Sequence, residues 1–110
     1  MDLFEKYMDP FDPNRKAKFK AQFDCGELEV DPAARTSVPE REILDALKRH
    51  LQMDFGERSA EEDFENFCAI TFWRGNARSK YISKNGIGFS IETDFDQNQT
   101  RVALLDERLL

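Results

Sequence analysis

The single histidine, His50, is the first side chain in this sequence that could perform acid–base chemistry. Nucleophilic catalysis would couple it to a serine or a cysteine, and no such residue is tied to it by a known spacing. One histidine excludes most catalytic triads and most metal-hydrolase sites. His50 falls near the apolar edge of a predicted helix, where a histidine is usually a border residue with a hydrogen-bonded ring nitrogen. We therefore predict no catalytic residues.

The two cysteines, Cys25 and Cys68, are far apart in the sequence. Small secreted domains that depend on disulfides usually contain more cysteines than this. A bridge between the two is an open alternative, because a hairpin and a central strand can lie side by side. Two unclustered cysteines and one histidine do not supply the four ligands of a zinc site. We expect free thiols, no cofactor and a cytoplasmic location.

The segment Asp94–Thr100 carries oxygen-bearing side chains at alternate positions, as the first half of an EF-hand calcium loop does. Two positions do not fit the pattern of a calcium loop. Gln99 stands where the sharp turn needs glycine, and Leu105 stands where a bidentate glutamate is needed. Strand-like segments also replace the flanking helices. A polar hairpin turn is the preferred interpretation, and calcium binding is the alternative.

A second group of carboxylates occupies residues 61–65, within a predicted helix. Divalent-metal nucleases gather carboxylates from different elements around a pocket, whereas an acidic run on one helix is usually a solvated face. Both acidic groups are therefore predicted to bind a protein partner. Their members are Glu61, Glu62, Asp63, Glu65, Asp94 and Asp96.

Charges are segregated into blocks along the chain. The sequence has 22 acidic and 16 basic residues, a net charge of −6 at pH 7. Separate blocks of charge can steer association with an oppositely charged protein. The basic blocks could instead contact nucleic acid by phosphate neutralisation and base stacking, although the net charge opposes this. The basic and aromatic candidates are Lys18, Lys20, Arg74, Arg78, Lys80, Lys84, Trp73 and Tyr81.

The elements that must position these residues begin with an amphipathic segment over residues 1–14. We expect it to pack on the domain as a short helix, the alternative being a docking peptide with aromatic anchors. Apolar and polar residues then alternate over 17–23 and again over 27–30, with a turn at 24–26. This pattern predicts a β-hairpin.

Two capping-box patterns predict helices. Ser37–Glu40 precedes apolar residues at helical spacing, so we expect a helix over about 38–54 that ends near Gly56. Ser59–Glu62 has the same form, and a shorter helix is predicted to run to about Phe67.

After that helix the apolar period changes to two. Residues 68–73 are apolar on both faces, which predicts a central strand covered on both sides or with one face reserved for a partner. Asn85-Gly86 lies between the strand-like segments 81–84 and 87–91. This dipeptide favours a tight hairpin, with positive φ at both turn positions. A last strand is expected over 101–105.

Together these elements predict one α+β domain over residues 1–110. We expect an antiparallel sheet of about five to six strands, with one long and one short helix inserted after the N-terminal hairpin. A short N-terminal helix would add to these. The sequence has no apolar run near the roughly 20 residues that cross a bilayer, and we expect no membrane partner.

Lacking a catalytic constellation, the sequence predicts a small, acidic, non-catalytic protein-interaction domain. It would act as an inhibitor, immunity-type or adaptor protein through surface and charge complementarity, as a monomer or homodimer. Mimicry of DNA by the acidic helix and turn is a sharper version of this hypothesis. Nucleic-acid or nucleotide binding through the basic strands is the first alternative. A metal-dependent enzyme with a carboxylate site is the second.

Overall fold

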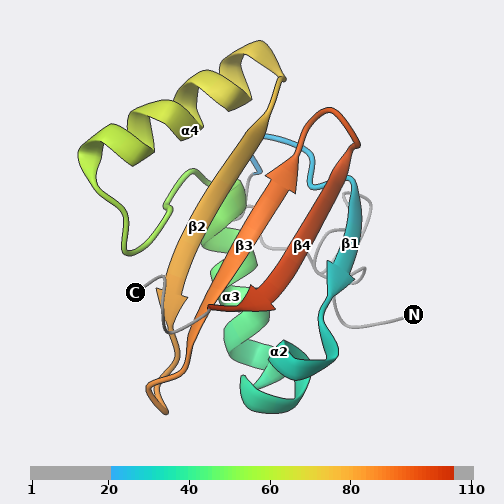
Figure 1. Cartoon of the computed structure of the whole chain (residues 1–110), viewed down its shortest axis with the longest axis vertical. Helices are drawn as coiled ribbons and strands as arrows, with labels where there is room; N and C mark the ends of the chain where they lie inside the picture. The colour runs from blue at the N-terminus through green and yellow to red at the C-terminus, as the bar shows by residue number, and fades with distance from the viewer. Residues whose placement is uncertain (1–20, 106–110) are drawn as a thin grey trace, which may run out of the picture.

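The computed structural model describes residues 21–105, which form an α+β structure with a four-stranded sheet and three helices (Figure 1). The leader segment 1–14 and most of the first predicted strand lie outside the described residues. The elements, in chain order, are β1 (Glu27–Val30), α2 (Pro32–Ser37), α3 (Glu40–Leu51), α4 (Ala60–Phe72), β2 (Asn76–Ile82), β3 (Gly88–Asp94) and β4 (Gln99–Leu104).

The sheet is mixed, with the order β1-β4-β3-β2. Strands β2, β3 and β4 form an antiparallel meander, and β1 pairs with β4 in parallel. The predictions of five to six strands and of a purely antiparallel sheet are therefore wrong. Residues 21–26 are not a strand, so the predicted hairpin with β1 does not form. Alternation shows that a segment is extended with one buried face, but it does not specify the strand with which it pairs.

Residues 68–73 form the end of α4 and the residue after it, not a strand. The second predicted helix therefore does not stop near Phe67. Helical spacing places Asn66, Ala69 and Ile70 on one side, where Asn66 is buried and the other two pack against the core. A short apolar run fits both the period of a strand and the period of a helix, so alternation over residues 68–73 did not distinguish the two.

Helix α3 confirms the longer predicted helix, although it is shorter than the expected 38–54. The first capping box is wrong, because Ser37 is the last residue of α2 and Pro39 is the N-cap of α3. The chain leaves α3 through Met53 at φ 67°, before it reaches Gly56. The glycine therefore has another role, described below.

The hairpin predicted at Asn85-Gly86 connects β2 to β3. Its turn differs from the expected one, because Gly86 is at φ +84° while Asn85 does not have positive φ. The Gly86 N–H donates to the Ser83 carbonyl at 2.9 Å, which closes a longer connection than a two-residue turn. The polar segment Asp94–Thr100 forms the β3–β4 hairpin, as preferred from the sequence.

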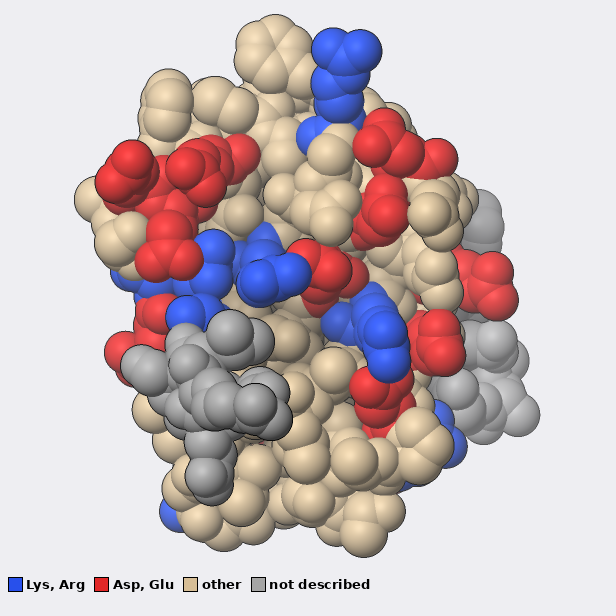
Figure 2. Space-filling model, in the orientation of Figure 1, with Lys and Arg blue, Asp and Glu red and all other residues tan. Residues whose placement is uncertain are grey.

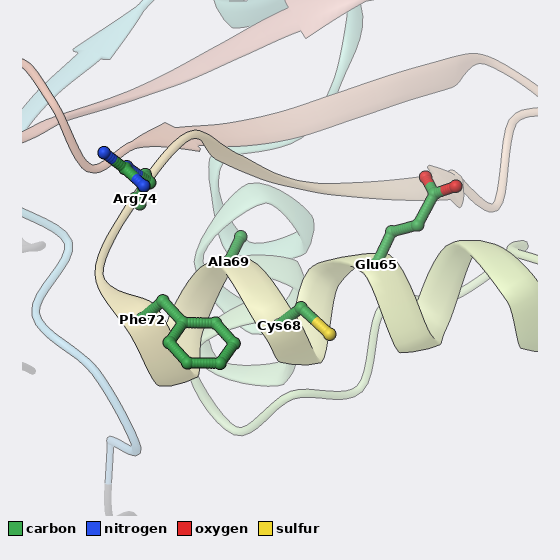
Figure 3. A pocket seen from close by; sticks show the side chains of 5 residues that line it. All are labelled: Glu65, Cys68, Ala69, Phe72 and Arg74. Carbon is green, nitrogen blue, oxygen red and sulfur yellow. The ribbon is translucent and has the colours of Figure 1, made fainter.

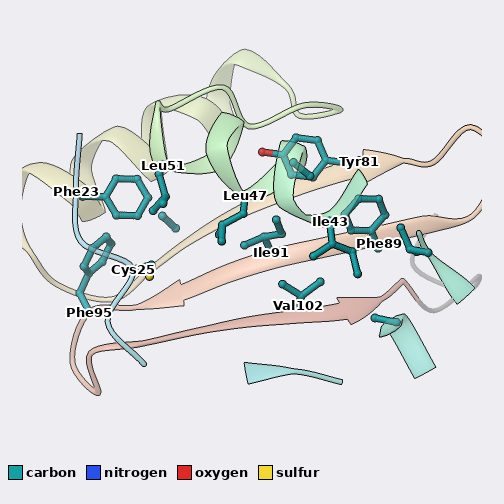
Figure 4. Packing of buried hydrophobic residues seen from close by; sticks show 14 residues of the cluster. Phe23, Cys25, Ile43, Leu47, Leu51, Tyr81, Phe89, Ile91, Phe95 and Val102 are labelled. Atoms are coloured by element: carbon teal, nitrogen blue, oxygen red, sulfur yellow. The ribbon is translucent and has the colours of Figure 1, made fainter. Parts of the chain in front are cut away.

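Helix α3 covers one face of the sheet, and the core lies between them (Figures 1 and 4). The opposite face carries charged side chains of both signs (Figure 2). The strand registers align four of them in one row across the sheet, because Arg101 faces Glu92 and Glu29, and Glu92 faces Arg78. Alternating charge on neighbouring strands favours this register. The largest fully buried apolar side chains are Phe89, Leu47, Leu51, Ile91, Val38 and Val102.

The outer edge of β2 is covered by two other segments of the chain. The Lys80 N–H donates to the Phe55 carbonyl at 3.0 Å, and the Lys80 carbonyl accepts from the Glu57 N–H at 2.8 Å. Beside it, the Asn66 amide donates to the Arg78 carbonyl at 2.8 Å and accepts from the Arg78 N–H at 2.9 Å. An uncovered edge would offer these groups to another strand. Asn66 therefore completes the sheet and fixes α4 against it.

Asn66→Asp is expected to destabilise the protein by about 2 kcal/mol or more. The carboxylate still accepts from the Arg78 N–H, but it cannot donate to the Arg78 carbonyl, which is left facing a buried charge. Urea unfolding followed by circular dichroism measures the loss. Asn76→Asp, at an exposed position of β2 opposite Asp94, is the matched control, and its new like-charge pair should cost less than about 1 kcal/mol. Equal effects of the two variants would contradict this role of Asn66.

Candidate functional site

Helix α4 begins with a complete capping box, which confirms the second capping prediction. The Ser59 hydroxyl accepts from the Glu62 N–H at 3.1 Å, and the Glu62 carboxylate accepts from the Ser59 N–H at 3.2 Å. These bonds lower the pKa of Glu62 below its ordinary value. Glu62 also pairs with Arg58 at 2.7 Å. The acidic first turn therefore suits the positive end of the helix dipole.

The end of α4 is fixed by an aromatic contact. Trp73 follows the helix in the left-handed conformation, with φ 52°, and redirects the chain into β2. Its ring centroid lies 4.8 Å from that of Phe95, the residue that follows β3. The Phe95 N–H donates to the Gly75 carbonyl at 2.9 Å, which adds a second link. Together with Asn66 in the middle, these contacts hold α4 in one place beside β2 (Figure 1).

From Phe64 onward, the side of α4 that points away from the sheet is apolar. Three phenylalanines are exposed there: Phe64 at 66%, Phe67 at 51% and Phe72 at 74%. Cys68 and Thr71 fall between them on the helical wheel, so one continuous stripe results. We call Phe64, Phe67, Cys68, Thr71 and Phe72 the outer face of α4. Such a stripe normally faces a protein core.

Opposite charges border this outer face. Glu61, Asp63 and Glu65 are exposed near the start of α4, and Arg74 is exposed just after its end. A hollow of about 610 Å³ lies along one border of this face, and Figure 3 shows the side chains that line it. It is lined by Glu65, Cys68, Ala69, Phe72 and Arg74. The helix thus presents an aromatic stripe that is acidic at one end and basic at the other.

The predicted acidic residues occupy two separate places. Glu61, Glu62, Asp63 and Glu65 lie together on the first turns of α4, whereas Asp94 and Asp96 lie in the β3–β4 hairpin. Asp94 accepts from two backbone N–H groups of that turn, and Asp96 accepts from the Gly75 N–H. Within residues 21–105, no group of three or more His, Cys, Asp or Glu side chains is placed to hold a metal ion.

The predicted basic residues are spread over several elements. Arg74 follows α4, Arg78 and Lys80 lie on β2, and Lys84 lies in the hairpin after it. Arg78 binds Glu92 with two guanidinium nitrogens, at 2.9 and 2.5 Å. Lys18 and Lys20 lie outside the described residues.

Tyr81, predicted as a surface residue for stacking, is in the core with 3% of its surface exposed. Its hydroxyl donates to the Asp54 carbonyl at 2.7 Å, and the Arg49 guanidinium lies 4.9 Å from its ring centroid. Burial raises the pKa of Tyr81. Its inward direction follows from the alternation of β2, in which Ala77, Ser79 and Tyr81 share the buried face. The ring is therefore closed to a base or a partner. Trp73, in contrast, is 46% exposed.

His50 is fully buried rather than a border residue. Its Nδ1 contacts the Ser79 hydroxyl, and its Nε2 lies 2.9 Å from the Thr93 hydroxyl. The Thr93 hydroxyl is hydrogen-bonded to the Thr100 hydroxyl at 2.7 Å, and the Thr100 hydroxyl donates to the Cys25 carbonyl at 2.5 Å. The Cys25 carbonyl can only accept, so Thr100 donates to it and accepts from Thr93. Thr93 in turn accepts from His50, so Nε2 carries the proton and Nδ1 accepts from the Ser79 hydroxyl. Burial lowers the pKa of His50 to about 3, which keeps the ring neutral.

The two thiols are free, so the alternative of a disulfide between them is not realised. Cys25 is buried, and burial raises its pKa to about 11. Cys68 is partly exposed on α4 and is the more accessible of the two.

The outer face of α4 was missed by the sequence reasoning. The helix after Ser59 was predicted to run only to about Phe67, and residues 68–73 were predicted to form a strand. The available signal was the spacing of five residues at 64, 67, 68, 71 and 72, which fits one helical side. Continuing the helical period past Cys68 would have predicted an outward apolar stripe.

Comparisons with protein-family models, with curated proteins and with solved structures found no match for this chain. None of the helices described here is both long enough and apolar enough to span a membrane.

Proposed function

We propose that this chain is a non-catalytic protein-interaction domain whose binding surface is the outer face of α4. The observation that carries the proposal is the exposure of Phe64, Phe67 and Phe72 along one side of a single helix. The three rings expose about 400 Å² together, if a whole phenylalanine side chain is taken as about 200 Å². Apolar patches of that size on a soluble domain are often functional.

The rigidity of α4 supports binding through a preformed surface. The capping box, the Asn66 amide and the Trp73–Phe95 contact restrain its start, middle and end. A surface that is already ordered loses little conformational entropy when a partner docks. Phenylalanine rings have few rotatable bonds, so they are also suited to act as anchors.

Charge supports a protein as the bound molecule. The acidic residues at the start of α4 lie against the same stripe as the phenylalanines, and they would repel a phosphate backbone. Arg74 at the other end gives the stripe both signs of charge, which favours an amphipathic protein segment. Among the described basic residues, Arg78 is already paired with Glu92, which weakens the nucleic-acid alternative. Inhibitor, immunity-type and adaptor roles all use such a surface.

A photo-crosslinking amino acid placed at Phe67 is expected to form covalent adducts with protein in an extract of the native host. The same probe placed at Ile82, which is 64% exposed on β2, is the matched control and should give few adducts. Phe64→Ser with Phe72→Ser should abolish the adducts while circular dichroism stays unchanged, because both rings are at the surface. Equal labelling from the two probe positions, or none from Phe67, would contradict the proposal.

A further inference from the structure

We infer that the outer face of α4 binds the outer face of a second copy of this chain, with the two helices antiparallel and related by a two-fold axis near Cys68. This inference rests on the proposed function, because it names the partner of that surface. It depends on the order of apolar and charged residues along α4 and on the area that the stripe exposes.

The apolar residues of the stripe are arranged symmetrically about Cys68. Phe64 and Phe72 lie four residues before and four residues after it. When two such helices run antiparallel across a two-fold axis at Cys68, Phe64 of one copy faces Phe72 of the other, twice. Phe67 of each copy then lies beside the axis. A C2 interface needs this self-complementarity, because the same patch must serve on both sides.

The charges along α4 are complementary under the same operation. Antiparallel helices place the same flank of each helix against the other, in reversed order. The flank that carries Glu61 and Glu65 also carries Arg74, since Glu65 and Arg74 line one hollow. The acidic end of one helix therefore lies along the basic end of the other. A parallel arrangement would instead place the acidic ends together, which is unfavourable.

The hollow on this flank fits the arrangement. Phe72 forms part of its lining, with Cys68 and Ala69 between the two charged ends (Figure 3). In the antiparallel register, Phe64 of the second copy reaches the Phe72 side of the hollow. Each of the two hollows would receive one ring, so the contact would be packed at both ends as well as at the axis.

The area of the stripe places the dimer among small interfaces. Two copies would bury about 800 Å² from the phenylalanines alone, and the helix flanks would add to this. Stable specific interfaces bury about 1,200–2,000 Å² in total. We therefore expect a reversible dimer with a Kd on the order of micromolar. Ile82, although 64% exposed, lies on β2 and outside this contact.

Analytical ultracentrifugation of the purified full chain measures the dimer directly. The sedimentation coefficient should rise with concentration, and the Phe64→Ser, Phe72→Ser variant should weaken the dimer at least about 100-fold. Ile82→Ser, the matched control, should leave the dissociation constant unchanged. A monomer at all concentrations up to about 1 mM, or equal effects of the two variants, would overturn the inference.

A short bismaleimide tests the position of the axis without changing α4. It should join two copies through Cys68, and Cys68→Ser should abolish the product while Cys25→Ser should not. A dimer that the reagent does not link would overturn the inference. The antiparallel direction is tested by charge exchange. Glu61→Arg with Glu65→Arg should weaken the dimer about tenfold, and adding Arg74→Glu should restore it. Failure of this rescue would contradict the antiparallel direction.

The two proposals can fail separately. If the purified chain stays monomeric while the probe at Phe67 labels a different protein, the second copy is the wrong partner and the interaction surface stands. If the chain stays monomeric and the probe labels nothing, both proposals are wrong. If the labelled product is a pair of this chain, both are supported.

Discussion

Replacing Gly56 with alanine is expected to lower the free energy of unfolding by about 3 kcal/mol or more. Gly56 is at φ +73°, a left-handed conformation that costs a residue with a side chain about 1–2 kcal/mol. A Cβ atom there would also lie 2.0 Å from the Lys80 carbonyl oxygen and 2.8 Å from the Tyr81 ring. The backbone would have to move away from β2, and the bonds of Phe55 and Glu57 to its edge would be lost.

Urea unfolding of Gly56→Ala measures this effect, and Gly86→Ala is its control. Gly86 is at φ +84°, but nothing lies within 4 Å of the Cβ position. Alanine at this position should therefore lose only the stability that the positive φ costs, about 1 kcal/mol. The difference between the two variants is therefore the cost of separating residues 55–57 from the sheet. If both variants lost the same stability, close approach to β2 would not be the role of Gly56.

Acidification from pH 7 to pH 5 is expected to destabilise the protein by about 2 kcal/mol through His50 alone. The pKa of His50 is lowered by burial from 6.5 in the unfolded chain to about 3 in the folded one. Between these values the unfolded state binds more protons than the folded state. The stabilisation is complete above pH 6.5 and is lost as the pH falls towards 3, with a slope of up to about 1.4 kcal/mol per unit.

The composition makes this effect separable from others. His50 is the only histidine, and carboxylates titrate mainly at lower pH. Asp54, whose pKa is lowered by its bond with Arg49, contributes below its ordinary value of 3.8. Urea unfolding at pH 7, 6 and 5 measures the slope, and His50→Gln should remove it. That variant should also lose about 2–4 kcal/mol at pH 7, because it breaks the buried network. Parallel pH profiles for wild type and variant would contradict this account.

Local signals in the sequence identified α3, the acidic start of α4 and both hairpins of the meander. The two capping boxes show the limit of such signals, since Ser37 and Ser59 have the same pattern. Ser59 is extended, at ψ 163°, and can cap a helix. Ser37 lies inside α2, where the segment from Pro32 already forms a helical turn, so its side chain cannot cap α3. The capping-box pattern covers only four residues, so it does not show whether the residues before it are already helical.

Long-range contacts could not be predicted in this way. Three helices and two strands separate β1 from β4 in the chain, so the alternation of Glu27–Val30 does not show that these two strands pair in parallel. The partners of His50 come from β2 and β3, so its burial follows from packing rather than from its place on the helical wheel. The outer face of α4 was hidden for a different reason. The predicted helix ended near Phe67, so Cys68, Thr71 and Phe72 were assigned to a strand, and a strand divides them between two faces.

The parallel pair of β1 and β4 also has a consequence for how the chain folds. The meander of β2, β3 and β4 joins neighbours in sequence and can form early, because short loops close at low entropic cost. The side-chain bond between Glu29 and Gln99 spans 70 positions. During synthesis β1 therefore leaves the ribosome long before its neighbour exists. Until β4 is synthesised, β1 has no strand to pair with, and its two glutamates and its short length disfavour pairing with another chain.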